Sequence, residues 1–404
     1  MKINLLPEAK RIKNTSQDLI DWKDPKPLFS KKINGIIRVC EPSLIGNEKK
    51  YVLDCLNTGW ISSHGKYIQK FEKLFAKKIG AKFAVATSSG STAIHLAAHI
   101  VNLKKGDEVI IPTATMVATA NMVKITGATP VFIDIDERTW NINVDLIEKK
   151  ITKKTKAIMP VHLYGHPAEM DKIKKLAKKY KLLIIEDGAE AHGAVYKNKK
   201  IGSIGDVTIF SFFANKNITS GEGGMLVTNN KKIYELAANV RNQSFSNKRH
   251  FWHKHVGFNY RMTNLQAAIG LAQTENLEKL VNRRINNAKI YNHYLKDIQG
   301  ISLPPSTKNI KNVYWMYTIV IDEDFGMSAI KLRYFLAKYG IETRSFFIPL
   351  HLQPIYFKRT YKNQFPVSEK IFKKSFYLPS SSHLTKKDIL YIVSKIKEAK
   401  ELQN

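Results

Sequence analysis

Three separated groups of residues in this chain carry side chains that could act together in covalent catalysis. The first is Lys216, which lies between two apolar segments in the run S-F-F-A-N-K-N-I-T-S-G-E-G-G of residues 211–224. A lysine amine attacks carbonyl carbon only when burial or nearby positive charge lowers its pKa. The small and hydroxyl residues around Lys216 would permit such close packing. In so lysine-rich a chain, a solvated loop lysine is the alternative interpretation.

The second group is the run S-S-G-S-T of residues 88–92. It follows a strand-like segment, Phe83 to Thr87, and precedes a helical pattern, Ala93 to Val101. Backbone N–H groups at such a helix start, together with the helix dipole, favour a bound phosphate. Helix capping is the structural alternative. The run lacks both the Gly-Lys-Ser/Thr of a nucleotide P-loop and the G-x-G-x-x-G of a dinucleotide site.

The third group centres on Asp187, which ends the apolar run Leu182 to Ile185. A carboxylate at the end of a buried strand is costly unless a cation pairs with it. A helix cap or a salt bridge would satisfy it, and so would a pyridinium nitrogen. An amine, a phosphate cup and a buried carboxylate are together what a pyridoxal 5'-phosphate (PLP) enzyme needs, so we predict PLP as the cofactor.

The elements around these groups alternate between strand and helix, which predicts an α/β layer with a mainly parallel sheet. Because ligands collect at the carboxyl ends of parallel strands, this arrangement would bring the three groups together. Strands are expected at residues 108–112, 130–135, 157–163, 182–186 and 207–212, and helices at 118–126, 144–151 and 170–180.

The length of 404 residues exceeds what one ordinary core requires and predicts more than one domain. We expect a lysine-rich N-terminal extension at residues 1–35, a large PLP-binding α/β domain at 36–273 and a smaller C-terminal α+β domain at 274–404. In the last of these, helical patterns cover 277–295, 329–339 and 386–401, and a strand-like run covers 316–321.

The composition is strongly basic, with 65 Lys and Arg against 34 Asp and Glu and a formal net charge of +31. Such a charge would suit nucleic acid, an anionic surface or a phosphorylated small molecule. The lysines are scattered, without a long basic block or an RNA-recognition or zinc-finger motif, so nucleic acid and metal are not expected.

The location is expected to be cytoplasmic. The only cysteines, Cys40 and Cys55, form neither a disulfide framework nor a C-x-x-C pair. The N-terminus lacks the apolar core of a secretory signal, and no segment reaches the length of a membrane span.

From about Ile37 onward, the chain resembles the DegT/DnrJ/EryC1/StrS family of PLP-dependent nucleotide-sugar aminotransferases. The resemblance implies the aspartate-aminotransferase-like fold, PLP fold type I, with a mainly parallel central sheet and a smaller C-terminal domain. The motifs that carry it are G-W-I-S-S (59–63), Y-I-Q-K-F-E (67–72), V-H-L-Y-G-H-P (161–167), S-F-F-A-N-K (211–216), T-S-G-E-G-G (219–224) and G-F-N-Y-R-M-T-N (257–264).

By this resemblance, Lys216 is the lysine that binds the cofactor's aldehyde and later moves a proton between cofactor and sugar. Asp187 is the partner of the pyridinium nitrogen, and Glu190 approaches the ring hydroxyl. The phosphate-binding positions are occupied by Ser91, Thr92 and Ser211. Asn259 lies on the loop that reaches the phosphate from a second subunit, which implies a homodimer with shared active sites.

Four residues are expected on the substrate side: Trp60, His162, Arg344 and His351. Arg344 and His351 match a C-terminal substrate-side motif of the family. For Trp60, which stands among small polar residues, the roles of active-site wall and core anchor are both open.

Two positions bear on the chemistry. Met116 stands where relatives place an aromatic residue on the pyridine ring, and a thioether covers that face without aromatic overlap. Lys216 is retained, whereas the family's sugar 3-dehydratases carry histidine there, which favours transamination.

The expected reaction transfers an amino group from L-glutamate to the C4 ketone of a nucleotide-linked 4-keto-6-deoxy sugar. GDP-4-keto-6-deoxymannose is the favoured substrate, and a UDP- or dTDP-linked sugar is the alternative. A non-catalytic nucleic-acid-binding protein on the same fold is the competing interpretation from another class.

Overall fold

The structure is a computed structural model, and it describes residues 25–28, 35–246, 248–249 and 251–403. Most of the expected N-terminal extension, residues 1–24 and 29–34, lies outside the described residues. Within them, none of the helices combines the length and the apolar character that crossing a bilayer would require.

The largest sheet has seven strands in the order β1-β9-β8-β5-β4-β2-β3. Every neighbouring pair is parallel except the two that contain β9. The predicted mainly parallel sheet is therefore confirmed. Its strands are β1 (Phe83–Thr87), β2 (Glu108–Pro112), β3 (Thr129–Ile133), β4 (Thr155–Ile158), β5 (Leu183–Asp187), β8 (Val207–Ser211) and β9 (Gly224–Thr228).

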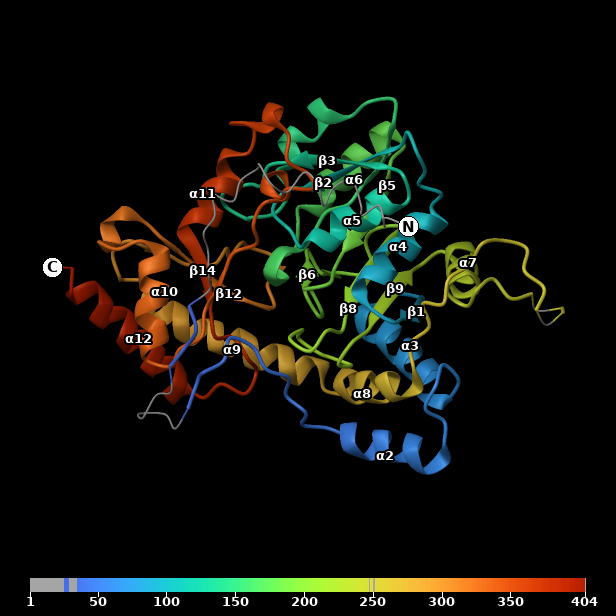
Figure 1. Ribbon diagram of the computed structural model, residues 1–404, viewed down its shortest axis with the longest axis horizontal. Helices are drawn as coiled ribbons and strands as arrows, with labels where there is room; N and C mark the ends of the chain where they lie inside the picture. The colour runs from blue at the N-terminus through green and yellow to red at the C-terminus, as the bar shows by residue number, and fades with distance from the viewer. Residues whose placement is uncertain (1–24, 29–34, 247, 250, 404) are drawn as a thin grey trace, which may run out of the picture.

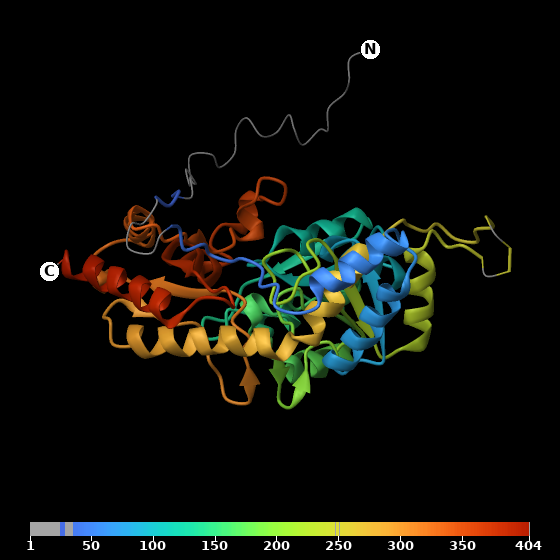
Figure 2. The same cartoon turned by 90° about the horizontal axis from the view of Figure 1, so that it is seen from below.

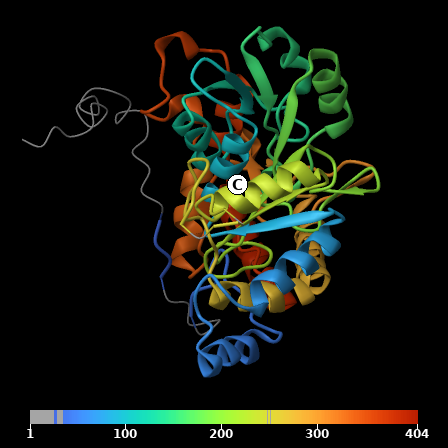
Figure 3. The ribbon, with the colours of Figure 1, turned by 90° about the vertical axis from the view of Figure 1, so that its right-hand side faces the viewer.

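Helices cover both faces of this sheet, as the apolar strands require. Successive side chains alternate between two cores: Ile110 packs into one cluster, whereas Val109 and Ile111 pack into the other. In Figure 3 the edge strand β1 lies between α7 and α3. One core contains residues of α3 (Lys66–Ile79), α6 (Met170–Tyr180) and α8 (Asn264–Glu275), and the other contains residues of α4 (Gly90–Ile100), α5 (Val117–Ile125) and α7 (Lys231–Arg241).

The C-terminal part forms an antiparallel sheet with the order β10-β12-β14-β13. Its elements are β10 (Ile301–Ser302), β12 (Tyr317–Ile321), α10 (Ala329–Lys338), β13 (Arg344–Ser345), α11 (Pro366–Lys374), β14 (Ser375–Leu378) and α12 (Lys386–Glu401). Helix α9 (Leu277–Leu295) follows α8 and runs toward this sheet (Figures 1 and 2). Its first turns pack into the core of the large sheet and its last turns into the C-terminal core. The expected division at residues 273/274 falls in the last turn of α8 and stays a prediction.

Short elements complete the chain. They are α2 (Glu48–Thr58), η5 (Leu163–Gly165), η6 (Glu323–Phe325), η7 (Leu350–Leu352), η8 (Arg359–Tyr361) and the small sheet of β6 (Val195–Tyr196), β7 (Lys199–Lys200) and β11 (Ile310–Lys311). The helix expected at 144–151 is instead two 3-10 turns, η3 (Val144–Leu146) and η4 (Glu148–Lys150). Hydrogen bonds from Ile147 to Val144 and from Ile151 to Glu148 close these tighter turns.

Candidate active site

A cavity of about 380 Å³ opens at the carboxyl edge of the parallel strands. This volume lies within the range of ligand pockets. The structure brings seven of the expected site residues to its wall: Ser91, Met116, Asp187, Glu190, Ser211, Lys216 and Arg344. They come from the start of α4, the segment before α5, the ends of β5 and β8 with the turns that follow, and β13.

Lys216 lies on the turn between β8 and β9, where its backbone N–H donates to the Phe213 carbonyl at 2.9 Å. Its side chain is only 10% exposed, and its Nζ is 3.8 Å from Glu190 Oε1. Burial lowers the pKa of the Lys216 amine, while the carboxylates of Glu190 and Asp187 act against this shift. At neutral pH a larger fraction of the Lys216 amine is therefore neutral than in an exposed lysine, and the neutral amine is the form that attacks a carbonyl.

Asp187 is the last residue of β5 and is 5% exposed. Its Oδ2 accepts a hydrogen bond from Thr119 Oγ1 at 2.8 Å, and its Oδ1 accepts one from the Ala189 N–H at 3.1 Å. Burial raises the pKa of Asp187, and these two hydrogen bonds partly offset the rise. A cation bound in the cavity would compensate the charge of the buried carboxylate, so the position of Asp187 suits a partner of a pyridinium nitrogen.

Glu190 faces Lys216 from the turn that follows β5. The Tyr164 N–H donates to its Oε2 at 2.7 Å, which fixes the carboxyl group. Burial raises the pKa of Glu190 to about 7, although the charge of Lys216 opposes the rise. This carboxyl group can therefore hold or release a proton beside the amine near neutral pH.

The start of α4 supplies the expected phosphate end. Gly90 allows this helix to begin against the end of β8, since a Cβ at Gly90 would lie 2.8 Å from Ser211 Cβ. Ser91 and Ser211 line the cavity there. Thr92 does not, because its hydroxyl closes the helix cap: Thr92 Oγ1 accepts from the Ser89 N–H at 3.0 Å. The start of α4 lies close to the end of β8, so the helix N-terminus and the hydroxyls of Ser91 and Ser211 could bind one phosphate group.

Two expected substrate-side histidines are buried away from the cavity wall. His162 Nε2 lies 3.0 Å from Glu186 Oε2, and its Nδ1 accepts the Ala168 N–H at 3.0 Å. His351 Nδ1 lies 2.7 Å from Thr113 Oγ1. Both rings are thus engaged in protein contacts, and a direct substrate contact by either one stays a prediction without geometric support.

Trp60 and Asn259 lie on the surface outside the cavity. Trp60 is 58% exposed, and its carbonyl accepts from Asn264 Nδ2 at 2.6 Å. The Oδ1 of the exposed Asn259 accepts from Arg261 Nε at 2.9 Å. Neither residue reaches the cavity of its own chain, so a site role for them would require a second subunit.

Sequence reasoning missed the aromatic residues that line the cavity. They are Phe213, Trp315, Phe347 and Tyr377. The ring of the buried Tyr164 joins three of them, with centroids 5.3 to 6.0 Å from those of Trp315, Phe347 and Tyr377. The aromatic run around Trp315 was the available signal, but such a run is more often core than ligand site.

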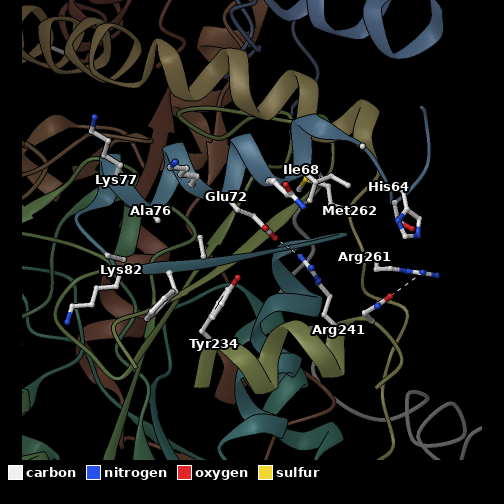
Figure 4. A pocket seen from close by; sticks show the side chains of 18 residues that line it. His64, Ile68, Glu72, Ala76, Lys77, Lys82, Tyr234, Arg241, Arg261 and Met262 are labelled. Carbon is white, nitrogen blue, oxygen red and sulfur yellow. Dashed lines mark hydrogen bonds and ion pairs between the residues drawn. The ribbon is translucent and has the colours of Figure 1, made fainter. Parts of the chain in front are cut away.

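A larger cavity, of about 650 Å³, runs along edge strand β1 between α3 and α7 (Figure 4). Its lining includes the basic side chains of Lys77, Lys82 and Arg261. Arg241 is paired there with Glu72, with Nη1 at 2.6 Å from Oε1. Neither the reactive lysine nor the buried carboxylates belong to this cavity, so the covalent chemistry lies in the smaller one.

Comparison with known proteins places this geometry in context. A sequence model of the DegT/DnrJ/EryC1/StrS aminotransferase family matches residues 42–397. The chain is 44% identical to a GDP-perosamine synthase of Escherichia coli O157:H7 over 362 residues, 90% of this chain and 98% of that protein.

Among solved structures, Helicobacter pylori PseC, an aminotransferase involved in the biosynthesis of pseudoaminic acid, matches with a TM-score of 0.86 and 29% identity. This match covers 91% of the chain and 100% of PseC. The PLP form of Spr1654 from Streptococcus pneumoniae matches with a TM-score of 0.84 and 26% identity, covering 91% of the chain and 100% of Spr1654.

Proposed function

Because the chain belongs to the DegT/DnrJ/EryC1/StrS family of PLP-dependent nucleotide-sugar aminotransferases, we propose that its sugar substrate is GDP-4-keto-6-deoxymannose. L-Glutamate would donate the amino group, and transfer to C4 would give GDP-perosamine. The 44% identity to a GDP-perosamine synthase over most of both chains supports this choice of sugar. The single observation that carries the catalytic assignment is the buried Lys216 amine, held in one cavity with the Asp187 and Glu190 carboxyl groups.

The residues of the cavity fit PLP from end to end. When bound, PLP supplies an aldehyde that takes up the amino group and a ring that stabilises negative charge on the adjacent carbon. Asp187 would face the ring nitrogen and keep it protonated. Ser91 and Ser211 would hold the phosphate at the start of α4, and Met116 would cover one face of the ring.

Lys216 carries out two tasks in this proposal. Its partly neutral amine binds the cofactor's aldehyde, and the same amine, once released, moves a proton at the reacting carbon. Glu190, 3.8 Å from Nζ, stands ready to balance the charge of the released ammonium. Since burial raises the pKa of Glu190 to about 7, this balance would depend on pH near neutrality.

The substrates would enter along the wall that carries Arg344. Its guanidinium is half exposed at the cavity and donates to Glu342 Oε1 at 3.2 Å. A guanidinium suits a carboxylate of glutamate or the diphosphate of a nucleotide sugar. The aromatic residues of the cavity, which include Tyr377, the cross-strand partner of Arg344, would receive the apolar face of the sugar ring.

We further propose a homodimer in which each subunit completes the other's site. Asn259 is exposed and outside its own cavity, and apolar side chains at Leu53, Leu56 and Trp60 are also exposed around α2. A second copy would cover this surface and bring an asparagine to the phosphate end. Sedimentation should give a dimer. The Asn259→Ala variant should bind PLP more weakly and should still sediment as a dimer. A fully active monomer would rule this arrangement out.

The sugar is tested by a two-stage absorbance experiment on the PLP-loaded protein. Glutamate should remove the visible band of the lysine-bound cofactor. After removal of glutamate, GDP-, UDP- and dTDP-linked 4-keto-6-deoxy sugars are added separately. Return of the band with the GDP-linked sugar alone would support the proposal. Return with only the UDP- or dTDP-linked sugar would replace the substrate, and no return with any of them would overturn it.

A further inference from the structure

A buried arginine lies directly behind the cavity. Arg284 of α9 is 2% exposed. Its Nη1 donates to the Trp315 carbonyl at 3.0 Å and to the Ser380 carbonyl at 2.8 Å, and its Nη2 donates to Cys40 Sγ at 3.3 Å. Within the described part of the chain, no carboxylate forms an ion pair with it. A buried guanidinium without a counter-charge is costly, so its place calls for an explanation.

Two of the residues that Arg284 contacts, Trp315 through its backbone carbonyl and Cys40 through its thiol, also donate from their side chains to one further atom. Trp315 Nε1 donates to the Asn215 carbonyl at 2.8 Å, and Cys40 Sγ donates to the same carbonyl at 3.0 Å. Asn215 immediately precedes Lys216 in the chain. Two distant segments, around Cys40 and before β12, thus meet at the peptide that carries the lysine, and Arg284 of α9 contacts both of them from behind.

Trp315 also contacts the amine itself. Lys216 Nζ lies 3.6 Å from the centroid of the indole ring, on the side of the cavity wall. Among aromatic rings, indole attracts a cation most strongly, and the attraction grows when both groups are desolvated. A buried ammonium therefore has a resting place between the indole face and the carboxyl group of Glu190.

We propose that Arg284, Cys40 and Trp315 form a brace that positions Lys216. Arg284 orients the other two residues, and their donors hold the Asn215 carbonyl and so the start of the lysine side chain. The indole face keeps the amine inside the cavity whenever it is not bound to the cofactor. These are positioning residues, and their role rests on the proposed function of Lys216 as the lysine that binds PLP.

The test begins with cofactor-free protein and follows the rate at which added PLP forms its visible band. Cys40→Ala removes one donor and should slow this capture about threefold, in line with the loss of one weak hydrogen bond. Cys40→Ser keeps a donor and should stay within about twofold of the unchanged protein. Cys55→Ser is the matched control, because Cys55 Sγ contacts Asn264 rather than the lysine turn.

Trp315 variants separate the two contributions of the indole. Trp315→Phe keeps a ring face but loses the N–H, whereas Trp315→Leu loses both and should slow capture about tenfold. The second measurement is the pH dependence of Lys216 acylation in cofactor-free protein, read by mass spectrometry. Loss of the face that favours the ammonium should move the acylation midpoint to lower pH in Trp315→Leu and less in Trp315→Phe.

The brace is wrong if Cys40→Ala and Trp315→Phe capture PLP as fast as the unchanged protein and keep its acylation midpoint. Thermal melting identifies a variant that fails to fold. If a Trp315 variant fails to fold, the comparison of Cys40→Ala with Cys40→Ser alone tests the brace. Failure of the proposed function looks different: the unchanged protein would form no visible band, or borohydride would trap PLP on another lysine.

Discussion

Replacing Gly90 with alanine should weaken PLP binding while leaving the fold intact. The new Cβ would lie 2.8 Å from Ser211 Cβ and 3.4 Å from Ser211 Cα. Because non-bonded carbons prefer separations of about 3.5 to 4.0 Å, the start of α4 would have to retreat by about 1 Å. Neither contact is with the free end of a flexible side chain, so little else can give way.

The cost falls on the phosphate end of the site. Forced overpacking costs about 1 to 3 kcal/mol. Because Gly90 is the first residue of α4, the helix preference of alanine offsets little of this cost, so the cofactor-free protein should lose about 1 to 3 kcal/mol of stability and remain folded. A retreat of α4 would lengthen a charge-assisted hydrogen bond to phosphate, and its loss, about 2 kcal/mol, corresponds to about a 30-fold higher Kd.

A double-mutant cycle isolates this clash. PLP affinity is measured from the visible band in Gly90→Ala, in Ser211→Gly and in the double variant. Ser211→Gly removes the Cβ that the alanine would meet, so Gly90→Ala should cost little in that background. An equal loss of affinity in both backgrounds would refute the steric reasoning, and so would unchanged affinity in Gly90→Ala alone.

Three other substitutions probe the ring end of the cavity. Met116→Phe adds aromatic overlap and should lower the Kd for PLP about threefold to tenfold. A higher Kd would contradict the assignment of Met116 to the face of the ring. Asp187→Asn removes the charge that keeps the ring nitrogen protonated, so the glutamate half-reaction should slow about 100-fold in stopped-flow absorbance, and a rate within about threefold would exclude the assignment. Burial raises the Glu190 pKa from 4.5 to about 7. The folded chain then holds more protons than the unfolded chain between these pH values, and stability falls as pH rises through this window. Cofactor-free Glu190→Gln should therefore melt at a higher temperature than the unchanged protein above pH 7, and a gap that widens on acidification would contradict the sign.

The turn of Lys216 and the end of β5 could be predicted because local pattern determines them. Apolar strands on both sides place the lysine on a connection, and the rule for parallel sheets places that connection at the ligand edge. The predicted strand at 157–163 instead ends at Ile158, and Val161 makes only an isolated bridge with Asp187. Pro160 between them has no N–H to continue the ladder.

Side-chain direction was harder to predict than position. Glu186 and Asp187 are successive residues of β5, so they point to opposite faces of the sheet. Asp187 faces the cavity, whereas Glu186 faces the core, where its carboxyl group contacts His162. The contact of Trp315 with Lys216 could not be predicted, because only the packing of the C-terminal part brings the two residues together.

The identity of the reactive lysine is the most direct test of the central claim. PLP-loaded protein is reduced with borohydride, digested and analysed by mass spectrometry, with Lys216→Ala as the control. We expect the pyridoxyl group on Lys216, and Lys216→Ala should fold, show no such label and complete no multiple turnover. A label on another lysine, or normal turnover by Lys216→Ala, would contradict the assignment.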